Sequence, residues 1–344
     1  MPPEELDRLF REWVHLLREA GAQIVFISAP WNVIMSAEHP WHEWHRTRLE
    51  KMIKLLSENG IEIALQWISC SAIPDDMWGG GVPPSDFKAY TAFAGEWAER
   101  YDGDGFNDAP GSPVVHYWSP WTEPDNPDQW RPKPDAAKYA EFQQLFYTAI
   151  KKANPKAVVL LAVLGPYGGG YVTQPQTACP FPELCAGNFL QALYDNGAKG
   201  SFEAVLIDPY PFCGGCGRPM RDFWKPEGLR ELQAEIDLVR QTIRRNGDDV
   251  PVIISEIGYP TAATRADIAP TTPDPEGTVA DWLKRLYTEL RGVETIAWWK
   301  AVTHMNVDPK DTMAVFFATS GLFLADGTPT RLFRAYQEAA TGRE

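Results

Sequence analysis

The feature that most constrains the fold of this chain is a regular alternation between short apolar runs and longer amphipathic segments. The runs resemble buried strands, and the segments between them have the apolar period of helices. Strands separated by helices pair in parallel, so the pattern predicts an α/β fold. The predicted strands are 23–29, 61–69, 114–121, 157–164, 204–210, 251–256 and 295–301. The predicted helices are 4–20, 42–59, 85–100, 135–153, 187–196, 227–246, 277–291 and 329–341.

The number of predicted strands bears on the type of α/β fold. A (β/α)8 barrel of the TIM type has eight strands, whereas this chain shows seven and opens with a helix pattern. We therefore expect such a barrel with its first strand missing or atypical at the N-terminus, or else an unusual closure. A doubly wound sheet is the alternative, but Gly165–Gly170 lacks the spacing of a G-x-G-x-x-G motif. We expect residues 1–344 to form one barrel domain.

Charge and hydropathy limit the partners of the chain. The net charge is −14 and no basic cluster occurs, which argues against nucleic acid and anionic membrane surfaces and favours a neutral ligand. No apolar stretch reaches the roughly 18 to 20 residues of a membrane span. Residues 1–20 have the pattern of an amphipathic helix rather than of a signal peptide. Most of the numerous aromatic residues suit a core, and the rest suit stacking against sugar rings.

Two glutamates stand at the ends of predicted strands. Glu123 lies in Trp121-Thr122-Glu123-Pro124-Asp125, and Glu256 lies in Ile253-Ile254-Ser255-Glu256-Ile257-Gly258. A single glutamate in such a place is most often a solvated loop charge. In a parallel barrel, however, the C-terminal strand ends converge on one face and supply the catalytic groups. Two carboxylates on different strands are what glycoside hydrolysis requires.

In these segments the sequence resembles the clan A glycoside hydrolases, most closely the family 39 and family 5 type. Residues 122–130 are similar to the acid/base motif, usually written Asn-Glu-Pro, and residues 255–261 to the nucleophile motif. Residues 149–157 and 321–329 resemble framework segments, and the resemblance covers about residues 5–340. It implies a retaining double displacement with Glu123 as acid/base and Glu256 as nucleophile, their carboxyl groups being about 5 to 5.5 Å apart.

The resemblance also suggests supporting residues. Asp208-Pro209-Tyr210 stands where the family often has His-x-Tyr, so Tyr210 could hydrogen-bond the nucleophile. Asp208 departs from the His; it is a candidate for substrate contact, and the alternative is a helix-cap or loop carboxylate. Either Trp298 or Trp299 would form the platform under the bound sugar. The other would face the barrel wall, because strand side chains alternate.

Three further residues are candidates for substrate contact. Thr122 stands where the clan normally has an Asn that binds the sugar 2-hydroxyl. An axial 2-hydroxyl in the substrate or a weakened enzyme would each account for the change. Asn32 and Trp31 follow the first predicted strand and could line the pocket, although Asn32 could equally form a turn.

Four cysteines form two close pairs, Cys179 with Cys185 and Cys213 with Cys216. Two local disulfides would place the protein in an oxidising, secreted or extracytoplasmic compartment. A structural four-thiolate zinc site is the alternative, since Cys-Gly-Gly-Cys has zinc-knuckle spacing. The histidine-rich run at residues 39–45 lacks an H-E-x-x-H motif and favours a loop and helix start, so no other metal or cofactor is predicted.

The sequence therefore predicts a retaining glycoside hydrolase that cleaves β-glycosidic bonds in oligo- or polysaccharides. The rival prediction is a weakly active or inactive carbohydrate-binding protein on the same scaffold, motivated by Thr122, Asp208 and the missing strand. A thiol- or metal-dependent enzyme built on the cysteine loops is a third reading.

Overall fold

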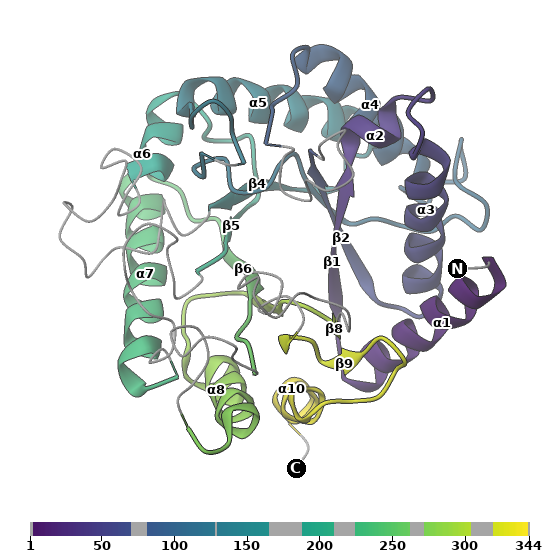
Figure 1. Cartoon of the computed structure of the whole chain (residues 1–344). Coiled ribbons are helices and arrows are strands. Elements are labelled where there is room, and N and C mark those ends of the chain that lie inside the picture. Colours follow the sequence, from purple (N-terminus) through teal and green to yellow (C-terminus); the bar gives the residue numbers. More distant parts are fainter. Residues whose placement is uncertain are drawn as a thin grey trace.

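The strands form one parallel sheet that curves into a barrel surrounded by helices (Figure 1). The computed structural model describes residues 3–69, 81–127, 129–164, 188–209, 224–261, 272–303 and 319–342. The sheet has seven strands in the sequential order β1 to β7, and each neighbouring pair is parallel. These strands are β1 (Ile24–Pro30), β2 (Glu62–Ile68), β3 (Tyr117–Ser119), β4 (Val158–Leu164), β5 (Ala204–Ile207), β6 (Val252–Ile257) and β7 (Thr295–Trp298). The predicted TIM-type barrel is confirmed.

The helices alternate with the strands and lie outside the barrel (Figure 1). They are α1 (Pro3–Glu19), α2 (Trp31–Met35), α3 (His42–Glu58), α4 (Phe87–Arg100), α5 (Ala136–Ala153), α6 (Asn188–Asp195), α7 (Pro226–Arg245), α8 (Pro275–Glu289) and α10 (Arg331–Thr341). Three of them begin where an aspartate accepts hydrogen bonds from free backbone N–H groups, namely Asp86, Asp135 and Asp274. The short α2 and the small sheet of β8 (Val302–Thr303) and β9 (Phe323–Leu324) were not predicted.

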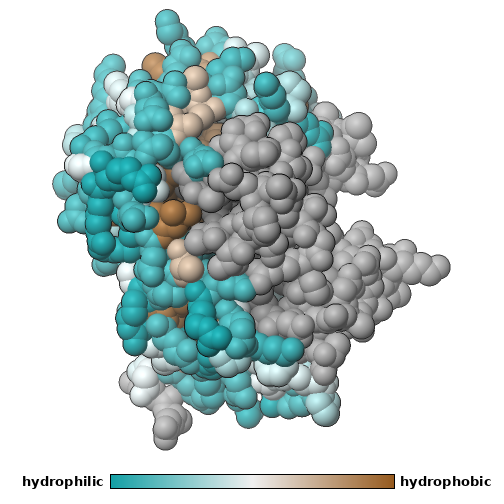
Figure 2. Space-filling model, turned by 90° about the vertical axis from the view of Figure 1, so that its left-hand side faces the viewer, coloured by the Kyte–Doolittle hydropathy of each residue, from teal (hydrophilic) through white to brown (hydrophobic). Residues whose placement is uncertain are grey.

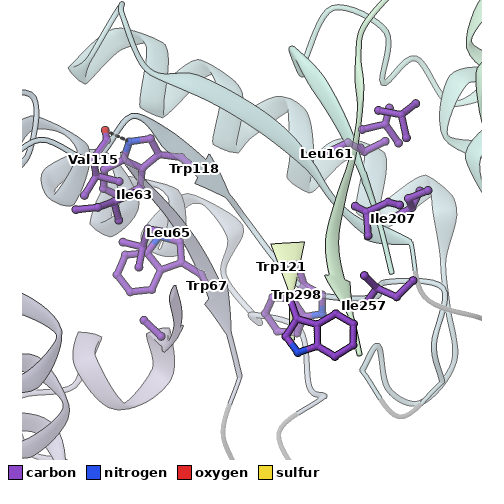
Figure 3. Close-up of a cluster of buried hydrophobic side chains, with 14 of the residues drawn as sticks. Ile63, Leu65, Trp67, Val115, Trp118, Trp121, Leu161, Ile207, Ile257 and Trp298 are labelled. Atoms are coloured by element: carbon purple, nitrogen blue, oxygen red, sulfur yellow. Dashed lines mark hydrogen bonds between the residues drawn. The ribbon is translucent and has the colours of Figure 1, made fainter. Parts of the chain in front are cut away.

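Strand alternation divides the apolar residues between two cores. Side chains from four strands fill the barrel interior, namely Ala64, Leu160, Ala204, Leu206 and Ile253. Their sequence neighbours point outward and pack against the helices, as Figure 3 shows for Ile63, Leu65 and Trp67. Trp67, which has no exposed surface, meets Trp97 of α4 edge to face at 5.4 Å between ring centroids. The two cores hold the strand ends, and any side chains on them, in fixed positions.

The sheet has an open seam between β1 and β7, which are not hydrogen-bonded to each other in the described part of the chain. A cavity of about 1030 Å³ follows this seam. Its walls are the facing strand edges together with residues of α1, α8 and α10, and it extends to Glu256 and Trp299. An eighth strand would occupy this place in a closed barrel. Helix α1 precedes β1, which forms one edge of the sheet, so the N-terminal end of the described barrel is atypical.

Of the residues coloured on the side formed by α6 and α7, most are hydrophilic and a narrow band is apolar (Figure 2). None of the described helices combines the length and the apolar character needed to cross a membrane.

Candidate active site

The segment that carries Glu123 is anchored on its buried side by aromatic residues and short hydrogen bonds. Strand β3 ends at Ser119, whose Oγ donates to the carbonyl oxygen of Trp121 at 3.0 Å. The hydroxyl of Tyr90, on α4, donates to the carbonyl oxygen of Pro120 at 2.7 Å. The indole Nε1 of Trp121 donates to the carbonyl oxygen of Gln129 at 2.8 Å. The chain after β3 is therefore fixed as it turns out of the barrel, and Trp121 lies among the buried residues in Figure 3.

Glu123 itself has an unusual backbone. Its φ of 37° is in the left-handed region, which few residues other than glycine adopt. Asn126 stabilises this turn twice: its backbone N–H donates to the carbonyl oxygen of Glu123 at 2.9 Å, and its Nδ2 donates to Oε2 of Glu123 at 2.7 Å. Residues in rare backbone regions gather at functional sites, where the surroundings hold them in place. Glu123 is half-buried, so its carboxylate has a defined orientation and access to solvent.

A β-bulge in strand β6 determines the direction of Glu256. The pairing of β6 with β7 shifts register between Ile254 and Ile257, and both of these isoleucines are buried in the outer core. Because Ile254 and Ile257 both face outward, the two residues between them, Ser255 and Glu256, can both face inward. Both line the seam cavity. Bulges next to active sites commonly redirect one side chain in this way.

The end of strand β7 brings two aromatic side chains to the cavity that contains Glu256. Trp298 is 8% exposed, and its Nε1 donates to the carbonyl oxygen of Ser320 at 2.8 Å. Trp299 follows the strand and is half-buried. Gly258 permits this arrangement, because a Cβ at that position would overlap the carbonyl oxygen of Trp299. Both predicted platform residues thus line the cavity, and Trp299 is the more exposed of the two.

Asp208 lies at the end of β5 and has no exposed surface. Its Oδ1 accepts a hydrogen bond of 2.9 Å from Oγ of Ser255. Burial raises the pKa of Asp208 well above its ordinary value, and the negative charges of Glu256 and then Glu123 raise it further. Because both glutamates act on one buried carboxyl group, the structure brings β3, β5 and β6 together at a common acidic site.

A second buried carboxyl group lies behind this site. Burial raises the pKa of Glu235, on α7, to about 8, and the negative charge of Asp125 contributes to the increase. Asp125 is fully buried and follows Glu123 by two residues. The acidic loop after β3 therefore has a protonatable neighbour on α7.

The remaining predicted site residues have different environments. Thr122 is half-buried beside Glu123, and Asn32 is half-buried in the first turn of α2. Trp31 starts α2 and packs edge to face on Tyr90 at 5.2 Å between ring centroids. Tyr210 and the cysteines Cys179, Cys185, Cys213 and Cys216 lie outside the described residues. Their predicted roles, including the choice between disulfides and zinc, stay predictions.

Among the described residues, one group of carboxylates lies close enough together to hold a metal ion, namely Asp102, Asp104 and Asp108 in the turn after α4. Asp104 is exposed and the other two are half-buried. Carboxylates of this turn accept hydrogen bonds from its own backbone, such as the bond of 3.0 Å from the N–H of Asp104 to Asp102. The turn is thus stabilised by the protein itself, and its acidic residues are not part of the site around Glu256.

Three residues of the site were missed or misjudged from the sequence. Asn126 was quoted only as part of the motif around Glu123, yet it holds both the backbone and the carboxylate of that residue. Ser255 was regarded only as a neighbour of Glu256, although it binds Asp208. Asp208 was expected to contact substrate, but its complete burial places it behind the surface that a substrate can reach. The apolar residues on both sides of Asp208 in 204–209 were the one signal of this burial.

The fold and the site together define a TIM-type barrel with carboxylates gathered at the C-terminal ends of its strands. Comparison with solved structures gives the same architecture. The structure is similar to a family 39 glycoside hydrolase from Bacteroides cellulosilyticus WH2, with 17% identity and a TM-score of 0.59. It is similar to a glucosidase from Croceicoccus marinus, with 14% identity and a TM-score of 0.63. A GH5_18 protein from Bifidobacterium longum subsp. infantis is 13% identical, with a TM-score of 0.61.

The alignments include 96%, 95% and 100% of this chain, respectively. This chain spans 60%, 62% and 74% of the lengths of those proteins. No protein-family profile and no curated protein sequence matches the chain. At these identities the similarity establishes the fold. The predicted TIM-type barrel is confirmed.

Proposed function

We propose that this protein is a retaining glycoside hydrolase that cleaves β-glycosidic bonds in oligo- or polysaccharides, and that residues 1–344 form one catalytic barrel. The observation that carries the proposal is the convergence of Glu123 and Glu256 on the buried Asp208 from two different strand ends. Glycoside hydrolysis with retention uses two carboxyl groups from opposite sides of the scissile bond. The solved structures of similar fold include a family 39 glycoside hydrolase and a glucosidase, which supports a carbohydrate substrate.

In the first step of the proposed reaction, Glu256 attacks the anomeric carbon while the protonated Glu123 donates its proton to the leaving oxygen. This step forms a covalent glycosyl ester on Glu256 and releases the first product. Glu123, now ionised, removes a proton from water as the water attacks the anomeric carbon, and the ester bond to Glu256 breaks. The second step regenerates both carboxyl groups and retains the β-configuration.

The surrounding residues support binding of a neutral sugar. Trp299 presents an aromatic surface in the cavity that contains Glu256, and sugar rings stack on such surfaces. We assign Thr122, beside Glu123, to the 2-hydroxyl of the bound sugar. Asn126 orients the acid/base carboxylate through its hydrogen bond of 2.7 Å. The proposed reaction itself requires no cofactor, because carboxyl groups supply both the proton and the nucleophile.

Kinetics of single variants on activated aryl β-glycosides test the assignment. Glu256→Gln should abolish hydrolysis, because the amide cannot attack the anomeric carbon. Glu123→Ala should lose most activity and recover part of it with azide, which needs no general base and yields a β-glycosyl azide. The matched control is Glu62→Gln, an exposed carboxylate at the opposite end of a barrel strand, which should remain fully active. Full activity in either Glu123→Ala or Glu256→Gln contradicts the proposal.

A sugar-binding protein without turnover is the second candidate, and two observations favour it. Thr122 replaces the usual Asn beside the acid/base residue, and the barrel is open between β1 and β7. This candidate predicts that the chain binds oligosaccharides, measured by calorimetry, but hydrolyses no aryl glycoside. Turnover that disappears in Glu256→Gln excludes it.

A further inference from the structure

The two carboxyl oxygens of the buried Asp208 differ in their hydrogen bonding. One oxygen, Oδ1, accepts the hydrogen bond from Ser255. The other oxygen, Oδ2, is also buried and has no hydrogen-bond partner among the described residues. An ionised carboxylate carries only acceptor oxygens, so leaving one of them buried and unbonded is costly.

The charged groups that face Asp208 make an ionised state less favourable still. They are Glu256 on β6 and the pair Glu123 and Asp125 in the loop after β3, and all of them are carboxyl groups. A negative charge on Asp208 would therefore be repelled from two sides of the site.

We propose that Asp208 is a neutral carboxylic acid, with the proton on Oδ2, and that it acts as a positioning residue by donating a hydrogen bond to the carboxylates of the candidate catalytic pair. Protonation converts the unbonded oxygen into a donor, and the carboxylates whose charges act on Asp208 offer acceptor oxygens. Ser255 selects the protonated oxygen, because its hydroxyl donates to Oδ1 and leaves Oδ2 for the proton. Burial favours the neutral form, because it raises the pKa of Asp208.

The proton on Asp208 has a specific consequence for Glu256. Among the carboxylates that raise the pKa of Asp208, Glu256 has the largest effect, and we therefore take it as the acceptor for the Oδ2–H group. A donor at the end of β5 to a residue in the bulge of β6 would tie the nucleophile to the neighbouring strand. The hydrogen bond would fix the orientation of Glu256 without adding another negative charge to the site.

Infrared difference spectroscopy tests the protonation state without any assumption about activity. At neutral pH the wild-type spectrum should contain the C=O stretch of a protonated carboxylic acid that is absent from Asp208→Asn. In Ser255→Ala this band should remain but shift to higher frequency, because the C=O group loses its hydrogen bond. If the spectra of the wild type and Asp208→Asn show no difference in this region, Asp208 is ionised and the proposal is wrong.

Kinetics test the positioning role, and this part rests on the proposed function. Asp208→Asn keeps a donor, Nδ2, at the place of Oδ2–H, so kcat should stay within about threefold of the wild type. Asp208→Leu has similar size but no donor, and kcat should fall about 10- to 100-fold with little change in KM, as expected for a misoriented nucleophile. Equal loss in the two folded variants, checked by circular dichroism, overturns the positioning role. If the chain hydrolyses no substrate, the infrared result still decides the protonation state.

Discussion

Glu235 on α7 should make the stability of the protein depend on pH, and Glu235→Gln should remove that dependence. The side chain is 5% exposed, and burial raises its pKa from 4.5 to about 8, with the charge of Asp125 contributing. Because the folded state favours the protonated form, the stability associated with Glu235 is fully present below pH 4.5. It is lost as the pH rises through about 8.

The size of the effect follows from this difference in pKa. Each unit is equivalent to about 1.36 kcal/mol, so the cost of keeping Glu235 protonated in the folded state grows by roughly 3 to 4 kcal/mol between pH 5 and pH 8. The neutral amide of Glu235→Gln avoids this cost. The free energy of unfolding of the variant, relative to the wild type, should therefore increase by about that amount over the same range. A constant offset from the altered packing does not affect this comparison.

Urea denaturation followed by tryptophan fluorescence, at pH 5 and pH 8, measures the difference. The control is Asp237→Asn, an exposed carboxylate on the same helix, for which the difference from the wild type should change little with pH. If the difference between Glu235→Gln and the wild type is the same at both pH values, the carboxyl group is not held protonated in the folded state. The reasoning from burial would then be refuted.

Two further predictions concern the loop that carries Glu123. Trp121→Ala should lower the free energy of unfolding by about 3 to 5 kcal/mol, because the side chain is only 1% exposed. Trp41, which is 48% exposed, is the matched control, and Trp41→Ala should cost less than about 0.5 kcal/mol in the same denaturation assay. Asn126→Ala removes the hydrogen bond of 2.7 Å to Oε2 of Glu123, and kcat on an aryl glycoside should fall about tenfold with a nearly unchanged melting temperature. An unchanged kcat would show that the carboxylate is oriented by other groups.

Local sequence patterns were sufficient for the main elements of the fold. Each of the seven predicted strands corresponds to a strand in the structure. Strands of a parallel sheet are buried on both faces, so they appear in the sequence as short, continuous apolar runs. The helices were found through their apolar period. The five-residue α2 and the two-residue strands β8 and β9 were missed, since elements this short show no period.

The site could be predicted in part for a similar reason. Glu123 and Glu256 stand out because each is a charged residue directly after an apolar run, next to a Gly or Pro turn signal. The bulge that turns Glu256 inward depends on the pairing of β6 with β7, which no single segment encodes. The bond from Asn126 to Glu123 depends on the left-handed backbone of Glu123, and nothing in the adjacent residues indicates that conformation.

The sequence by itself determined that the chain alternates strands and helices, that seven apolar runs form strands, and that two glutamates end strands. These properties follow from apolar periodicity and turn chemistry, which act over a few residues. Only the tertiary structure decided that Trp298 is the more buried of the two tryptophans at the seam cavity, and that Asp208 lies behind the site without solvent. Burial and electrostatic repulsion depend on residues distant in the sequence, such as Glu123, Asp208 and Glu256, and these meet only when the barrel forms.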